Sequence, residues 1–203
     1  MRIPTALVFA LLMTFALPVS ADAFRSVPDS PVQLQIVRRD GETFLVDISN
    51  PSDVAATFDA VGLYFVPELS KSEALAQRLG VVTPGQTSTN GTEWRDAGNV
   101  LQLAPHQSVL VKLTSYCLDS QRRSPTDKTQ YHLANTRMPA SLNSELARVA
   151  WMIATLGFDP DTTSGPMQGV LQHATPAATS TLTQQAIWRI RQSSKVSLAG
   201  ETR

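Results

Sequence analysis

The first half of the chain alternates apolar and polar residues with the period of β-strands. This alternation runs over 32–36 and again over 44–48, as expected for strands with one buried face. Asp40-Gly41 lies between these runs and predicts a tight hairpin turn. A turn cluster over 50–53 ends the hairpin, and a further β-rich run covers 54–66. The chain is therefore expected to begin as an antiparallel sheet.

The pattern is mixed from residue 70 to residue 119. A capping box at 70–73 with Gly80 beyond it predicts a short helix, and the Gly-, Thr- and Ser-rich stretch 83–98 predicts an exposed loop. Alternation then returns over 109–113. If it is extended, Cys117 lies on the inward face of the same strand.

Helical periodicity follows in the second half. Tyr131–Leu133 is expected to be one last strand, and Ser141 is expected to cap a helix that runs through Leu156 to Gly157. A second helix is expected from Thr181 to about Ser193. In that helix Thr181 and Gln184 form a capping box, and Trp188 packs one turn after Gln184.

These elements predict an α+β protein. We expect an N-terminal antiparallel, immunoglobulin-like β-sandwich over 24–120, and a small helical part over 121–194 that completes one compact unit. Residues 195–203 are expected to form a disordered tail.

The N-terminus has the features of a secretory signal peptide. A short basic start precedes an apolar run over 6–13, and small residues follow up to Ala23, so residues 1–23 are expected to be cleaved after Ala21 or Ala23. The apolar run is too short for a membrane span. The sequence therefore predicts an exported protein, periplasmic or extracellular, with no membrane span after cleavage.

Charge and histidine placement limit the possible chemistry. The 17 basic and 17 acidic residues balance, so a nucleic-acid partner is not expected. His106, His132 and His173 lack metal-ligand spacing, and there is no second cysteine. Neither a metal nor a cofactor is predicted.

Cys117 is the one cysteine of the chain, so it cannot form an internal disulfide. It could be a small buried hydrophobe with a structural role, as free cysteines often are. It could also be the nucleophile of a hydrolase or transferase, with His132 as the base.

Two short motifs resemble the thioester domains of Gram-positive surface adhesins. The first is Tyr116-Cys117-Leu118, and the second is Thr183-Gln184-Gln185-Ala186-Ile187-Trp188, which matches a Thr-Gln-x-Ala-Ile/Val-Trp element. A looser glutamine element is matched by 167–171. The resemblance covers about Leu113 to Arg191, and it implies a β-sandwich with a helical part.

This resemblance implies an internal thioester that captures an amine on a partner. Cys117 would supply the sulfur and Gln184 the acyl group, while Tyr116, Thr183 and Trp188 would support the site. The partner would be a protein or glycan surface ligand, reached through an amine such as that of lysine. In the alternative hypothesis, the protein is a non-catalytic binding module whose loops, especially 83–98, contact the partner.

Overall fold

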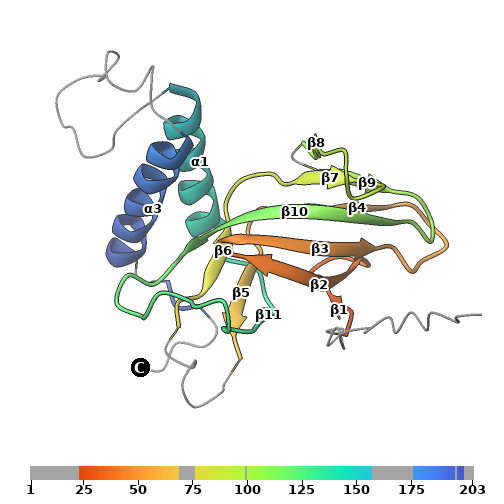
Figure 1. The fold of residues 1–203 in the computed structure, drawn as a ribbon, viewed down its shortest axis with the longest axis horizontal. Coiled ribbons are helices and arrows are strands. Elements are labelled where there is room, and N and C mark those ends of the chain that lie inside the picture. The colour runs from red at the N-terminus through yellow and green to blue at the C-terminus, as the bar shows by residue number, and fades with distance from the viewer. Residues whose placement is uncertain (1–22, 69–75, 99, 157–175, 195, 199–203) are drawn as a thin grey trace, which may run out of the picture.

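The computed structural model describes residues 23–68, 76–98, 100–156, 176–194 and 196–198. The fold is mostly antiparallel β-structure with two helices, which makes it broadly α+β (Figure 1). The predicted signal peptide lies outside the described residues except for Ala23. Gly157, the glutamine element at 167–171 and His173 also lie outside them.

A large sheet of antiparallel strands forms the body of the protein. Its strand order is β1-β2-β3-β10-β6-β5-β11, with β7 also pairing with β10 and with β8, and β4 and β9 form a separate two-stranded sheet. The strands are β1 (Arg25–Ser26), β2 (Gln33–Asp40), β3 (Thr43–Ser49), β4 (Ala56–Phe58), β5 (Tyr64–Pro67), β6 (Leu79–Val81), β7 (Gln86–Ser88), β8 (Arg95–Asp96), β9 (Leu101–Leu103), β10 (Ser108–Cys117) and β11 (Tyr131–Leu133).

The helices are α1 (Ala140–Leu156) and α3 (Pro176–Ser193). They pack against each other beside one end of the long strands (Figure 1). The apolar stripe predicted for the first helix is confirmed, because Leu142, Leu146, Val149 and Ile153 are all buried.

Apolar clusters lie on opposite faces of the strands near the helices. The first cluster lies between the large sheet and β4–β9 and contains Phe44, Phe65 and Cys117. The second contains Tyr116 and Leu118 together with residues of both helices. Adjacent residues at the end of β10 therefore face different clusters, as the period of two in a strand requires. The predicted inward orientation of Cys117 is confirmed.

The helix predicted between residues 70 and 80 is wrong at its C-terminal end. Residues 69–75 lie outside the described part of the chain, but Leu79–Val81 form strand β6, which pairs with β10 and with β5. A Cβ atom at position 80 would lie 2.8 Å from Cδ2 of Leu118. Gly80 is thus needed for close packing across the strands and does not end a helix.

Other local predictions also need correction. The turn between β2 and β3 has Gly41 and Glu42 at its centre, with φ of 56° at Gly41, so it is shifted by one residue from the predicted Asp40-Gly41. The stretch 83–98 is not only a loop, since it contains β7 and β8. Asn143 N donates a hydrogen bond to Pro139 O, so α1 begins before Ser141.

The predicted disordered tail is also partly wrong. Val196 packs against the second cluster, and Leu198 is buried in it. The backbone oxygen of Leu198 accepts a hydrogen bond of 3.0 Å from Arg78, so this short segment is fixed on the core. The other residues of the predicted tail lie outside the described part.

Candidate functional site

Cys117 and Gln184 lie in contact, although they are 67 positions apart in the sequence. The backbone N–H of Cys117 donates a 2.8 Å hydrogen bond to Oε1 of Gln184, and Nε2 of Gln184 donates a 2.7 Å hydrogen bond to the backbone oxygen of Cys117. The carboxamide of Gln184 therefore lies beside the residue that carries the thiol. The resemblance predicts a bond from Sγ of Cys117 to this carboxamide, whereas the contact seen here is made by the backbone of Cys117.

The β2–β3 hairpin ends before it reaches Cys117, so the backbone of Cys117 at this edge of β10 has no neighbouring strand among those described. Ser115 N still donates to the backbone oxygen of Glu42, but the hairpin turns at Gly41–Glu42. Since alternate residues of a strand direct their N–H and C=O groups to the same edge, Cys117 lacks a strand partner there. The carboxamide of Gln184 occupies the place of the next strand residue.

The predicted position of Gln184 at a helix N-terminus is wrong. Helix α3 begins at Pro176, so Gln184 lies in its third turn, and Thr181 is inside the helix instead of capping it. Free N–H groups of a helix start are therefore not available around its carboxamide. The N–H of Cys117 is the donor that contacts Oε1.

Two of the residues predicted to support the site, Tyr116 and Thr183, contact each other next to Cys117 and Gln184. Thr183 is buried and forms a side-chain hydrogen bond with Tyr116. Trp188 is partly buried and packs against the first cluster, which contains Cys117. Its buried Nε1 has no hydrogen-bond partner among the described residues.

The environment of Cys117 keeps its thiol protonated. The side chain is buried, and this desolvation, together with the negative charges of Glu42 and Asp119, raises its pKa from 9.0 to about 12. Arg39 acts in the opposite direction. Burial also raises the pKa of Glu42, whose carboxylate is therefore a stronger base than an exposed one.

Arg78 and Asp119 form a buried ion pair that fixes the end of β10. Arg78 is fully buried, and it donates from its backbone N, Nε and Nη2 to the carboxylate of Asp119. Arg191 of α3 lies 3.9 Å from the same carboxylate. Through Arg191, the carboxylate of Asp119 thus holds α3 near Cys117, and this stabilises the position of Gln184.

Sequence reasoning missed this ion pair. Arg78 falls in the segment for which local pattern predicts a helix, and Asp119 matches none of the motifs recognised in the sequence. A basic residue just before the Leu79–Val81 strand and an acidic one just after the β10 strand would be the signal, since antiparallel pairing brings these two ends together.

His132 is not brought to Cys117. It pairs with Val66 in β5, whereas Cys117 is in register with Leu79, Phe65 and Leu133 across the sheet. His132 therefore faces the opposite side of the sheet and lies three strand spacings away, roughly 14 Å. This geometry contradicts its predicted role as a base for the thiol. In the described part of the chain, no cluster of His, Cys, Asp and Glu side chains could hold a metal ion.

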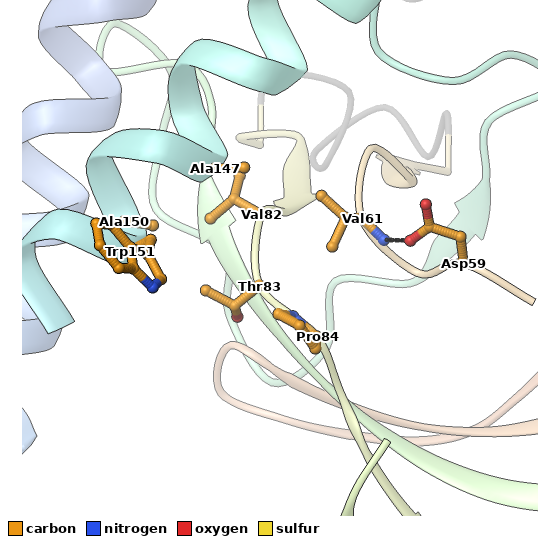
Figure 2. A pocket seen from close by; sticks show the side chains of 8 residues that line it. All are labelled: Asp59, Val61, Val82, Thr83, Pro84, Ala147, Ala150 and Trp151. Carbon is orange, nitrogen blue, oxygen red and sulfur yellow. Dashed lines mark hydrogen bonds between the residues drawn. The ribbon is translucent and has the colours of Figure 1, made fainter. Parts of the chain in front are cut away.

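A separate cavity of about 530 Å³ lies between α1 and the loops that follow β4 and β6. Figure 2 shows Trp151 on one side of it and Val61 and Pro84 on the other. Trp151 is 57% exposed, so a large aromatic surface faces this space. The cavity borders the second cluster, and it could accept an apolar group of a partner.

No protein-family model matches the chain, and no curated protein matches it. Among the described residues, no helix is long and apolar enough to cross a membrane.

Proposed function

We propose that this protein is an exported thioester-type domain in which Cys117 and Gln184 form an internal thioester that captures an amine on a partner. The contact between the Gln184 carboxamide and the backbone of Cys117 is the observation that carries this proposal. The immunoglobulin-like character of the β-structure, and location in the periplasm or outside the cell, belong to the same proposal.

The chemistry is an exchange of nitrogen for sulfur at one carbonyl carbon. Sγ of Cys117 attacks Cδ of Gln184, the C–N bond breaks, and the nitrogen leaves as ammonia after taking up the thiol proton. Oxyanion charge develops on Oε1, which already accepts the N–H of Cys117, so this donor stabilises the tetrahedral intermediate. A partner's amine then attacks the thioester carbonyl, an amide forms, and the thiol is released.

The thiol needs a base, because its pKa lies far above neutral pH. Two carboxylates act on it electrostatically, but that of Asp119 is engaged by Arg78. Glu42 remains as the proton acceptor, and the upward shift of its pKa brings it closer to neutral pH, where a base works best.

Intact-mass measurement of the purified protein tests the proposal. The mature protein should be lighter by one ammonia than the mass of its sequence after signal-peptide cleavage, and methylamine should convert it to a heavier adduct. Cys117→Ala should abolish both effects, while Gln185→Ala, on the exposed residue next to Gln184, should preserve them. Glu42→Gln should slow the loss of ammonia. A wild-type chain of full mass would overturn the proposal.

A second candidate is a non-catalytic binding module with a structural cysteine. It is favoured by the hydrogen bonds that both Oε1 and Nε2 of Gln184 form with the backbone of Cys117, and by the protonated state of the thiol. In that case Gln184 only completes the edge of β10. The protein would keep its full mass, and Cys117→Ala would leave partner binding intact.

A further inference from the structure

A polar recess lies on the face of the large sheet that is turned away from the first cluster. It has a volume of about 340 Å³ and is bordered by β2, β3, β10 and β7, which lie side by side (Figure 1). The polar side chains that line it are Arg38, Asp40, Thr43, Gln86, Lys112 and Thr114. This size is within the range of small-ligand sites.

Strand register arranges these side chains in rows across the sheet. Lys112 is opposite Leu45 on one side and Gln86 on the other, and Leu45 is in turn opposite Arg38. The neighbouring row contains Asp40, Thr43 and Thr114. Residues directly opposite each other share a face, so each row presents its side chains to the same recess.

A β-bulge in β2 brings the charged residues into the recess. The register shifts between Ile36 and Arg38, and Val37 is the extra residue. Without this bulge, Arg38 and Asp40 would face the core with Ile36, since alternate residues share a face. Bulges are frequent next to functional sites because they redirect side chains in this way.

The recess offers both donors and acceptors that are not used within the described residues. None of the six lining side chains forms a hydrogen bond or ion pair with another described residue. Next to the row of Lys112, Asp47 has a buried Oδ1 without a hydrogen-bond partner among those residues. Such a group is costly unless something hydrogen-bonds to it.

Lys112 is held in place by Trp94. Its Nζ lies 3.8 Å from the centre of the indole ring, which is a cation–π contact. Trp94 belongs to the 83–98 stretch that the sequence suggested as a partner-binding loop. The contact restricts a side chain that would otherwise be flexible. Lys112 is therefore preorganised, and less conformational entropy is lost when it binds a ligand.

We propose that this recess binds a neutral saccharide. A sugar hydroxyl both donates and accepts hydrogen bonds, so it needs a mixed set of side chains such as Lys112, Asp40 and Thr114. The carboxylate of Asp40 in the lining, with that of Asp47 buried next to the recess, offsets the charges of Arg38 and Lys112, which opposes binding of phosphate or sulfate. The proposal goes beyond the thioester, and it gives the binding-module alternative a site and a ligand class.

Binding to an array of neutral, uronate-bearing and sulfated oligosaccharides tests the proposal, followed by calorimetric titration with the best neutral binder. Asp40→Ala and Lys112→Ala should each weaken binding at least tenfold. Asp127→Ala and Lys128→Ala are matched controls on an exposed loop away from the recess and should leave binding unchanged. The backbone amides of Thr43, Gln86 and Thr114 should shift in nuclear magnetic resonance spectra during the titration.

Other outcomes would overturn the inference. These are no binding to any neutral saccharide, binding only to sulfated sugars or inorganic sulfate, or equal affinity for the Lys112→Ala and Lys128→Ala variants. Cys117→Ala should bind the saccharide like the wild type. A failure of the thioester would therefore leave this result unchanged, and a failure here would leave the mass measurement unchanged.

Discussion

A thioester between Cys117 and Gln184 would cross-link β10 to α3, and its loss should have a large effect on stability. The bond closes a loop of 67 residues. In the chain-entropy model, a cross-link of this length stabilises the folded state by about 4 kcal/mol, because it restricts the unfolded chain. Methylamine would open the cross-link without any change of sequence.

Urea unfolding of the wild type with and without methylamine treatment measures the stabilisation that the cross-link provides. With a denaturant slope of about 2 kcal/mol per molar, the unfolding midpoint should fall by about 2 M on treatment. Cys117→Ala serves as the control, since methylamine should not affect it. This variant should lose the cross-link and, in addition, about 1 kcal/mol of packing from the removed sulfur.

A protein without the cross-link would give a different result in both assays. If methylamine changes neither the mass nor the urea midpoint, and Cys117→Ala costs only about 1 kcal/mol, there is no cross-link. The hydrogen bonds of Gln184 would then account for the whole contact with β10.

Further predictions concern the surroundings of the site. Gln184→Glu should be more stable at pH 4 than at pH 7 in urea unfolding, because the ionised side chain repels the Cys117 carbonyl, and only the protonated one can donate to it. Arg78→Met should cost about 3–5 kcal/mol in the same assay, since it leaves the Asp119 charge buried without its partner. His132→Ala should not change alkylation of Cys117 in methylamine-treated protein, and the alkylation rate should keep rising toward pH 12.

The sequence predicted the strands best where one face is buried. Alternation over 109–113 identified β10 and the inward side of Cys117, because a half-buried strand imposes a period of two on its residues. It failed over 76–80, where a capping box and a glycine suggested a helix. There, pairing of Leu79–Val81 with β10 determines the structure, and such non-local pairing is not visible in local propensity.

The candidate site was predicted in part, for a similar reason. The motif resemblance identified Cys117 and Gln184, and the structure brings them together. The recess on the outer face was missed, because it depends on a bulge at Val37 that no local pattern reveals. Residues of four strands line it, and they become neighbours only through the register of the sheet.

The hydrogen bonds of Gln184 also bear on which nucleophile the site would favour. Loss of ammonia removes the Nε2 donor, so in the thioester the partly buried oxygen of Cys117 loses this hydrogen bond, which costs about 1 kcal/mol. Attack by an amine produces a secondary amide whose N–H can restore that donor. Attack by water produces a carboxylate, which places an oxygen against the same carbonyl oxygen. The contact that brings Gln184 to Cys117 would therefore favour capture of an amine over hydrolysis.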